Sequence, residues 1–420
     1  MPALWVRVDA ALICVHLIRA VYRHLLEGAL HGRVVASAAR IRFATCAARA
    51  TPQIIMLLVG ILGVCSAMRM PVSRRSAVHG AGVLGMGIIQ SPAFAADPAP
   101  GSIGSRVEEL KTLGVRVQQS TVESDAEFWS GRLQGRPPPD PKVVLRDAPP
   151  IVILPGFGND AIDYIQPNGQ PKEVGLVAAL SRRGVGLVAV VPIMRSNWLN
   201  VARGLTDVKF ATGDAQPEGP AFSWYVQAAK QTVEETVAAR RAEQEKIGGD
   251  PRVVLLGHSA GGWLARALCV VQGDEWARRN VRGVVTLGAP HASPPPEVAD
   301  QTRGTIPNIN RRAPGAYLAK SGVFYVTVSS ARVVGDADGD ASAQNAFTAY
   351  KLILGRSQGV KGDGFVPIEA AFLDGATQLT LDCFHSGGSA DPWPKDDWYG
   401  AERNVDAWLG PVAELLKKRS

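Results

Sequence analysis

The run Val253-Val254-Leu255-Leu256-Gly257-His258-Ser259-Ala260-Gly261-Gly262 predicts a buried strand that turns sharply into a helix. Four apolar residues precede a G-x-S-x-G motif, which is typical of a strand–turn–helix unit with the serine at its tip. Glycine at 257 and 261 fits such a turn, because a Cβ at either position would collide where backbones come close. Ser259 would then be exposed at the carboxyl end of the strand, next to the helix N-terminus.

Strand and helix patterns alternate on both sides of this motif. Apolar runs typical of strands lie at 151–154, 185–191, 253–256, 281–287, 323–329 and 378–381. Helix patterns lie at 173–183, 224–246, 260–271 and 401–417. Short apolar runs without polar alternation, separated by helices, favour a mostly parallel sheet with helices on both faces. We therefore predict one α/β domain over 150–420, with insertions at about 192–222 and 289–322 that form a cap or lid.

A serine hydroxyl needs a base to act as a nucleophile, and residues 97–420 contain three histidines. His258 adjoins Ser259 in the turn, so we expect its ring to point away from the hydroxyl. His291 lies at a strand tip, where we expect a loop histidine bonded to backbone. His385 follows the last predicted strand, which is the position of the base when the order is serine, acid, histidine. We therefore predict that His385 is the base.

The acid of such a set should lie between the last two predicted strands. Asp363 is the leading candidate, because the glycines on either side of it let the backbone turn its carboxylate toward the imidazole. Its rivals are Asp336, Asp338 and Asp340. These three resemble a calcium loop only superficially, since the glycine is misplaced and no glutamate stands at the twelfth position. We predict a solvated acidic turn there.

Two backbone N–H groups are predicted to stabilise the negative charge that develops when the serine attacks. The loop at 156–159 follows the strand at 151–154 and can present the N–H of Phe157 beside the N–H of Ala260. Loss of one such donor typically slows a reaction by about 10²- to 10³-fold. We therefore expect this loop to be as sensitive to substitution as the three side chains.

Four motifs follow one another along the chain, at 155–158, 257–262, 362–367 and His385. Together they resemble the α/β-hydrolase superfamily of the lipase and esterase type, over about residues 150–410. Residues 257–262 together with 287–291 are similar to plant and algal plastid α/β-hydrolases and, more distantly, to inositol-deacylase-like lipases. The resemblance implies carboxylic-ester hydrolysis through an acyl-enzyme, with Ser259 as nucleophile, His385 as general base and Asp363 as orienting acid. Strands before residue 151 are hard to find, which suggests a shortened sheet.

The insertions bear on the substrate. Apolar and aromatic side chains gather around the first of them: Met194, Trp198, Leu199, Phe210, Phe222, Trp224 and Tyr225. Such side chains suit either an acyl-chain pocket and lid or the small core of a cap. We expect a small-molecule or lipid acyl ester as substrate, with peripheral contact to a membrane surface. Four arginines in the insertions have two interpretations. They either bind a phosphate or sulfate headgroup or lie on a solvated surface: Arg195, Arg203, Arg311 and Arg312.

Two other functions use the same fold. An acyltransferase would employ the same three side chains in a site that excludes water. A catalytically silent relative would serve as a ligand-binding or scaffold protein. The sequence has no phosphate loop, dinucleotide fingerprint or metal-ligand spacing, so we predict no cofactor and no metal. Cys269 and Cys383 are expected to be free, buried thiols.

Residues 1–96 are predicted to be a cleavable targeting region. They hold ten arginines, no lysine and two acidic residues, a net +8 within a chain whose total is +7. The rest of the chain is therefore near neutral, which excludes a large basic surface for nucleic acid. An Arg-rich start resembles an organelle transit peptide, and Arg74-Arg75, an uncharged stretch at 77–90 and small residues at 93–96 resemble a twin-arginine export signal.

This two-part address predicts a plastid protein of the thylakoid lumen, with another exported or organellar compartment as the alternative. The mature chain would start near Ala96 and carry an N-terminal extension over 97–149. A membrane anchor at 54–67 is a competing interpretation, although that apolar run is shorter than the ~20 residues that span a bilayer. A true start at Met68 or Met70 would leave a bacterial-type export signal and the same mature chain.

Overall fold

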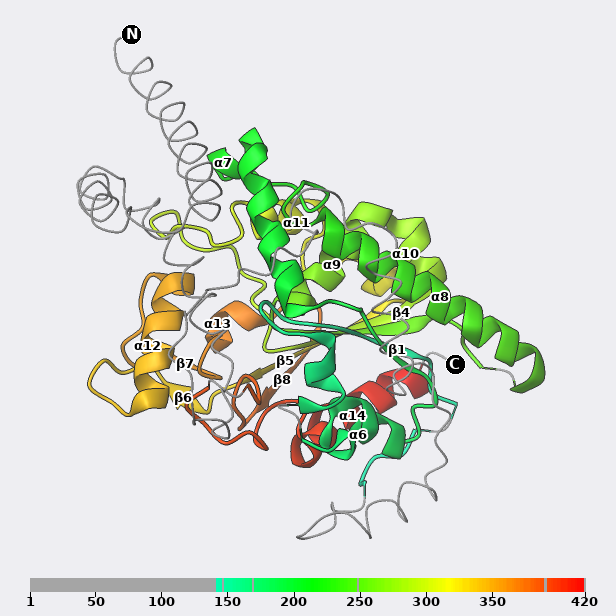
Figure 1. The fold of residues 1–420 in the computed structure, drawn as a ribbon. Helices are drawn as coiled ribbons and strands as arrows, with labels where there is room; N and C mark the ends of the chain where they lie inside the picture. The colour runs from blue at the N-terminus through cyan, green and yellow to red at the C-terminus, as the bar shows by residue number, and fades with distance from the viewer. Residues whose placement is uncertain (1–140, 146, 168–169, 248, 389–390, 419–420) are drawn as a thin grey trace, which may run out of the picture. The chain divides into compact units, whose positions relative to one another are not determined.

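The structure is a computed structural model that describes residues 141–420, apart from residues 146, 168–169, 248, 389–390 and 419–420. The predicted targeting region and most of the predicted extension lie outside the described residues. Strands and helices alternate along the described chain, as the sequence predicts (Figure 1). In this part of the chain no helix combines the length and the hydropathy that crossing a bilayer requires.

A six-stranded parallel sheet forms the centre of the domain. Its strands are β1 (Ile151–Leu154), β2 (Val188–Val190), β3 (Val253–His258), β4 (Val281–Leu287), β5 (Phe324–Ser330) and β8 (Thr377–Leu381). They lie in the order β2-β1-β3-β4-β5-β8, and all neighbours pair in parallel. The order reverses direction between β1 and β3, and ligands of open α/β sheets bind beyond the carboxyl ends of strands at such a point. No strand precedes β1 among the described residues, in agreement with the expected short sheet.

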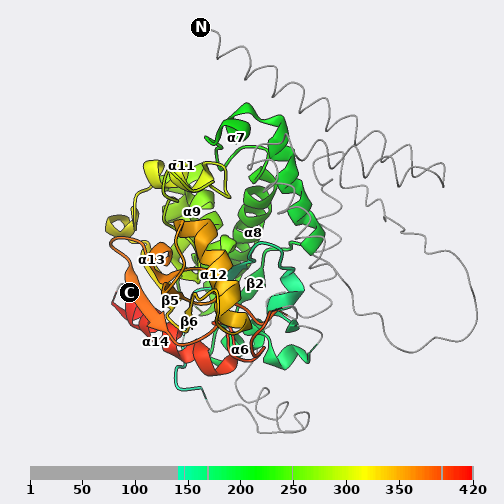
Figure 2. The same cartoon turned by 90° about the vertical axis from the view of Figure 1, so that its left-hand side faces the viewer.

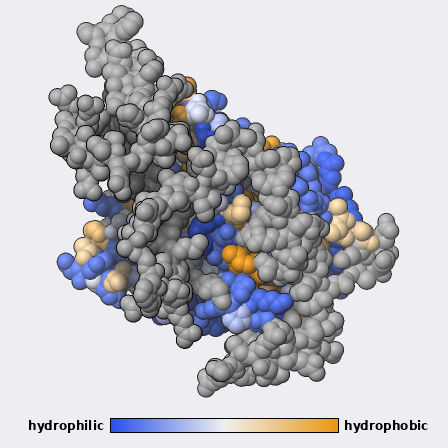
Figure 3. Space-filling view, viewed as in Figure 1, coloured by the Kyte–Doolittle hydropathy of each residue, from blue (hydrophilic) through white to orange (hydrophobic). Residues whose placement is uncertain are grey.

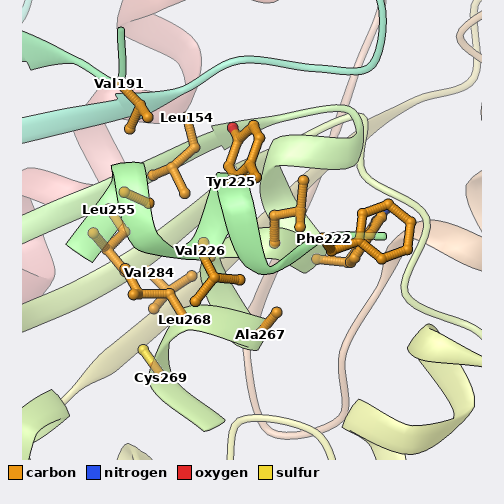
Figure 4. Packing of buried hydrophobic residues seen from close by; sticks show 14 of the residues in the cluster. Leu154, Val191, Phe222, Tyr225, Val226, Leu255, Ala267, Leu268, Cys269 and Val284 are labelled. Carbon is orange, nitrogen blue, oxygen red and sulfur yellow. The ribbon is translucent and has the colours of Figure 1, made fainter. Parts of the chain in front are cut away.

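Helices cover both faces of this sheet, which confirms the predicted layers. Helices α8 (Ser223–Ile247), α9 (Ala260–Gln272) and α10 (Asp274–Asn280) lie on one face, and α6 (Leu176–Arg182) and α14 (Glu402–Lys417) lie on the other (Figure 1). Alternate strand residues enter opposite cores: Val152 and Leu154 pack with α8 and α9, whereas Ile151 and Ile153 pack with α6 and α14. Figure 4 shows Tyr225, Val226 and Leu268 of the first layer packed on Leu154, Leu255 and Val284 of the sheet.

The second helix layer is held together by a buried cation. Arg183, directly after α6, donates from Nε to Asp406 Oδ1 and from Nη1 to Glu402 Oε1, both at 2.7 Å. Asp406 also accepts the backbone N–H of Lys142 at 3.1 Å, and Leu145 is buried in the same core. The described end of the predicted extension therefore packs on the α6–α14 layer.

The two predicted insertions pack against each other. The first contains the 3-10 helix η5 (Arg195–Thr206) and α7 (Val208–Thr212), and the second contains α11 (Thr305–Arg312); Figures 1 and 2 draw α7 and α11 at the same end of the domain. Arg311 lies 3.0 Å from Asp214 and Arg312 2.9 Å from Glu218, so these arginines join the insertions by ion pairs. The aromatic side chains are buried in the core: Trp198, Phe210, Phe222, Trp224 and Tyr225. They share one cluster with the sheet and with α8 and α9, so these rings belong to the main core of the domain, and no separate core of a cap is formed by them.

A segment between β5 and β8 holds elements that the sequence patterns did not predict. It contains α12 (Ala341–Leu354), α13 (Ile368–Ala371) and a small antiparallel sheet of β6 (Val333–Val334) and β7 (Lys361–Gly362). Asp340, in the predicted acidic turn, caps α12, because its Oδ1 accepts the N–H of Ala343 at 2.9 Å. Strand β7 ends directly before Asp363.

Candidate active site

Ser259 stands at the turn between β3 and α9 in a strained backbone conformation. Its φ is 53° and its ψ is −128°, a region that residues other than glycine rarely occupy and that costs about 1–3 kcal/mol. The carbonyl of Leu287 at the end of β4 accepts the Ser259 N–H at 2.9 Å. The surrounding fold therefore holds this serine at the carboxyl edge of the sheet, where strain is common at functional positions.

Two glycines permit the close approaches at this turn. A Cβ on Gly257 would lie 2.4 Å from the Cα of Gly262, as expected for strand and helix backbones in contact. A Cβ on Gly261 would lie 2.0 Å from the carbonyl oxygen of Leu154. The obstacle at Gly261 therefore belongs to the neighbouring strand β1, which the sequence pattern around Ser259 alone does not identify.

Asp363 and His385 form a hydrogen-bonded pair. Oδ2 of Asp363 lies 2.8 Å from Nδ1 of His385 and also accepts the hydroxyl of Tyr399 at 2.9 Å. Oδ1 accepts the backbone N–H groups of Phe365 at 2.9 Å and Val366 at 2.7 Å. An ionised carboxylate only accepts hydrogen bonds, so Nδ1 of His385 donates and, in the neutral ring, Nε2 carries the lone pair.

The charge state of Asp363 follows from these bonds. The side chain is fully buried, and burial by itself raises the pKa of a carboxyl group. The attraction of His385 and the hydrogen bonds of His385, Val366 and Phe365 outweigh burial, so that the pKa of Asp363 lies below its ordinary value. Asp363 is therefore a carboxylate at neutral pH, prepared to stabilise a positive charge on His385.

Ser259 and His385 both lie close to the ends of β3 and β4. Nε2 of His258, the residue before Ser259, lies 2.9 Å from the carbonyl oxygen of His385. A Cβ on Gly288, the residue after Leu287, would lie 3.1 Å from Nδ1 of His385. Within the described chain Ser259 Oγ has no hydrogen bond to His385. In enzymes without substrate such a bond is often long, and it tightens when substrate binds.

The loop after β1 lies directly beside Ser259. A Cβ on Gly156 would lie 2.8 Å from the Cβ of Ser259, so Phe157 follows at the edge of the site. Neither the Phe157 N–H nor the Ala260 N–H donates a hydrogen bond within the described residues. The insertion holds this loop, since Trp198 Nε1 donates to Asn159 O at 3.0 Å.

The ring of Phe157 is exposed at this edge. It is 49% exposed, with its centroid 5.0 Å from that of Trp198. Hydrophilic residues cover much of the described surface in Figure 3, and hydrophobic ones form small groups. The other exposed large hydrophobic side chains among the described residues are Val144, Leu205, Val208 and Val334. Phe157 is therefore an exposed aromatic residue on the loop whose Gly156 lies beside Ser259.

The other two histidines have different surroundings. His258 points away from Ser259, as expected, because its ring is hydrogen-bonded to Tyr164 and to the backbone of His385. Burial lowers the pKa of His258 to about 3, with a smaller contribution from His385. The ring of His291 is also buried, and its Nε2 lies 3.1 Å from the hydroxyl of Thr286. The expectation of a ring bonded to backbone is wrong for His291, because Thr286 of β4 supplies the partner.

Among the described residues no group of three acidic, histidine or cysteine side chains could hold a metal ion. Cys269 and Cys383 are free and buried, as predicted. Burial raises the pKa of the Cys269 thiol to about 12. Burial also raises the pKa of the Cys383 thiol, so burial disfavours the thiolate form of both residues.

Three features identify the architecture. They are six parallel strands between helix layers, a strained serine on a glycine-flanked turn after β3, and a histidine beyond β8. The chain has an α/β-hydrolase fold. Residues 214–344 of this chain match the family described as a PGAP1-like alpha/beta domain. No curated protein matches the chain in sequence.

Several solved structures are similar to this chain. A lipase from Bacillus licheniformis in its mature form is 15% identical with a TM-score of 0.36, covering 65% of this chain and 94% of that one. A metagenomic carboxyl esterase is 13% identical with a TM-score of 0.34, covering 73% and 94%. A carboxylesterase from Lactobacillus plantarum is 13% identical with a TM-score of 0.34, covering 65% and 86%.

Proposed function

We propose that this protein is a serine hydrolase that cleaves carboxylic esters through an acyl-enzyme, with Ser259 as nucleophile, His385 as general base and Asp363 as orienting acid. The observation that carries the proposal is the buried Asp363–His385 pair at 2.8 Å, which leaves Nε2 of His385 to act as a base at the edge where Ser259 stands. A buried carboxylate in this position keeps the imidazole in the required tautomer and stabilises the imidazolium.

The reaction would proceed in two similar halves. His385 Nε2 takes the Ser259 Oγ proton while Oγ bonds to the acyl carbon, and the carbonyl electrons move onto oxygen. The N–H groups of Phe157 and Ala260 are proposed to bind this oxyanion. The ester C–O bond then breaks, and His385 gives its proton to the leaving alcohol. Water repeats the sequence and releases the carboxylic acid and free Ser259.

The proposed substrate class is a small-molecule or lipid acyl ester. The exposed ring of Phe157, on the loop whose Gly156 lies beside Ser259, supports an apolar acyl group. Leu205 is 43% exposed and Val208 75% exposed on the first insertion, which supports contact with a lipid surface. Arg311 and Arg312 are engaged in ion pairs with acidic residues, so we do not assign them to an anionic headgroup.

The test uses the full-length chain on p-nitrophenyl esters of increasing acyl length, triacylglycerols, phospholipids and galactolipids. We expect hydrolysis of at least one class and its loss in Ser259→Ala, whereas Ser342→Ala, a change on α12, should match the unmodified chain. Activity that persists in Ser259→Ala would refute the proposed nucleophile. Transfer of the acyl group to an added alcohol in preference to water would instead indicate an acyltransferase.

We further propose export to a plastid compartment, in particular the thylakoid lumen, from the Arg-rich start and the paired arginines at 74–75. N-terminal sequencing of the protein recovered from the cells that make it should read a start near Ala96. A sequence that begins upstream of Ser73 would rule out cleavage at that site.

A further inference from the structure

Two buried side chains connect the three backbone segments of the candidate site. Tyr164 ends the short 3-10 helix η2 (Ala161–Tyr164), and His258 is the last residue of β3. Each is 1% exposed. Trp398 packs edge-on against both rings, with centroid distances of 6.2 Å to Tyr164 and 5.4 Å to His258. The two rings are therefore fixed by packing as well as by hydrogen bonds.

The hydrogen bonds of Tyr164 and His258 have one consistent proton arrangement. Tyr164 Oη accepts the Gly156 N–H and the Asn159 Nδ2–H, each at 2.9 Å. Its own proton is then available to Nδ1 of His258, 2.8 Å away. The remaining proton of the neutral His258 ring lies on Nε2 and is donated to the carbonyl oxygen of His385 at 2.9 Å. Every donor in this chain of bonds meets an acceptor.

The hydrogen bonds of Tyr164 and His258 hold backbone groups that lie in, or next to, the residues proposed to act in the reaction. Gly156 precedes Phe157, the proposed oxyanion donor, and His258 precedes Ser259. The carbonyl held by His258 belongs to His385 itself. A displacement of the Tyr164 hydroxyl would therefore move the oxyanion loop relative to the nucleophile and the base, and displacements near 1 Å at a reacting centre can cost about 100-fold in rate.

We propose that Tyr164 and His258 are positioning residues, which hold the Phe157 loop and the backbone of His385 in register with Ser259; this inference rests on the proposed serine hydrolase function. Among the described residues neither side chain is hydrogen-bonded to Ser259 Oγ or to the imidazole of His385, although the His258 ring packs against that imidazole with the ring centroids 5.0 Å apart. Their contribution is to keep three segments, separated by about a hundred residues of chain each, in one geometry while the imidazole of His385 takes and returns a proton.

The test compares variants of the full-length chain. Tyr164→Phe keeps the ring and removes the hydroxyl, so Gly156, Asn159 and His258 lose their common partner. Tyr325→Phe is the matched control, because Tyr325 is also a buried tyrosine, and within the described chain its hydroxyl has no hydrogen bond to Gly156, His258 or His385. Two readouts are measured: kcat and KM on p-nitrophenyl butyrate, and the rate and extent of labelling by a fluorophosphonate.

For Tyr164→Phe we expect kcat and the labelling rate to fall by about 10- to 100-fold, with KM within about threefold and labelling still reaching one per chain. Tyr325→Phe should keep kcat within about twofold. A purely structural role of Tyr164 would lower the unfolding midpoint and leave kcat of the folded molecules unchanged, which would overturn the inference.

A second pair of variants keeps the test informative if Tyr164→Phe does not fold. His258→Gln carries an amide N–H close to the place of Nε2, so it can still donate to His385 O, whereas the shorter His258→Asn cannot reach it. We expect kcat of His258→Gln to exceed that of His258→Asn by about tenfold, and equal values would contradict the inference. If the unmodified chain is not labelled at all, the proposed function itself is wrong; labelling at equal rates in every variant refutes only the positioning role.

Discussion

The Tyr399 hydroxyl lies 2.9 Å from Oδ2 of Asp363, the same oxygen that meets Nδ1 of His385 at 2.8 Å. With two backbone N–H groups on Oδ1, this carboxylate accepts four hydrogen bonds and has no contact with solvent. Such a carboxylate is fixed in orientation and ionised, which are the properties that the orienting acid of a serine hydrolase needs.

Asp363→Asn should reduce kcat by about 10³- to 10⁴-fold with little change in fold. The amide can donate a hydrogen bond to Nδ1, which favours the tautomer with the proton on Nε2 and removes the base. Steady-state kinetics and the urea midpoint measure the two effects. Asp338→Asn, at an exposed rival position, should behave as the unmodified chain. A large loss in Asp338→Asn together with an active Asp363→Asn would reverse the assignment of the acid.

Gly261→Ala should destabilise the fold by about 3 kcal/mol or prevent folding, because the new Cβ would meet the Leu154 carbonyl at 2.0 Å. Backbone on both sides would have to move. The matched control is Gly186→Ala, where a Cβ meets nothing within 4 Å. Urea unfolding should give a clearly lower free energy of unfolding for Gly261→Ala than for the unmodified chain. The free energy of unfolding of Gly186→Ala should lie within about 0.5 kcal/mol of that of the unmodified chain. Equal midpoints would show that the turn can open at no cost.

Stability should decline as the pH falls below about 6.5. His258 has its pKa lowered by burial from 6.5 to about 3, and burial also holds the pKa of His291 well below its ordinary value. The unfolded chain therefore binds more protons than the fold between these values, so the stabilisation is complete above pH 6.5 and is lost on acidification. Each histidine that stays neutral in the fold adds to this loss of stability as the pH falls through the window.

Urea midpoints at pH 8, 6.5 and 5 measure the slope of stability against pH. His258→Gln removes one of the two titrating groups and should reduce the slope between pH 6.5 and 5 by about half. An unchanged slope in that variant would show that His258 does not remain neutral in the fold.

Arg183→Met should destabilise the protein by about 3 kcal/mol or more, since Asp406 would lose its buried cation and Glu402 would keep only its pair with Arg182. The side chains of Glu402 and Asp406 are only 16% and 18% exposed, so water compensates them poorly. Arg279→Met is the control, because its pair with Glu275 is exposed and such pairs contribute about 0–1 kcal/mol. Chemical denaturation of both variants should separate them clearly; similar losses would mean that the α6–α14 layer does not depend on Arg183.

The central sheet was predictable because its strands are short, most of them are rich in apolar residues, and helices separate them. The predicted bounds of the strands at 151–154 and 281–287 agree with β1 and β4, whose residues are all buried. The helix expected from 173 starts at Leu176 instead, because Gly175 is extended and a Cβ there would meet the Ile165 carbonyl at 2.1 Å. The contact of Gly175 with the Ile165 backbone sets the start of this helix. The sequence of the helix itself does not reveal that contact.

Other features depend on contacts between distant residues. The pairing of the two insertions rests on ion pairs such as Arg311–Asp214, and the bond between Tyr164 and His258 joins positions 94 residues apart. Motif order indicated Asp363 and His385, and the structure brings those two together. Nothing in the sequence around His258 indicates that its ring meets the backbone of His385. A contact between residues so far apart in the sequence becomes visible only in the folded chain.

The site of covalent modification tests the assignment of Ser259 as the nucleophile. The full-length chain is treated with a fluorophosphonate, digested, and the modified peptide is sequenced by mass spectrometry. We predict one adduct per chain, on Ser259, that forms slowly in Asp363→Asn and His385→Ala. An unmodified chain under conditions that label a known serine esterase, or an adduct on any other residue, would contradict the account.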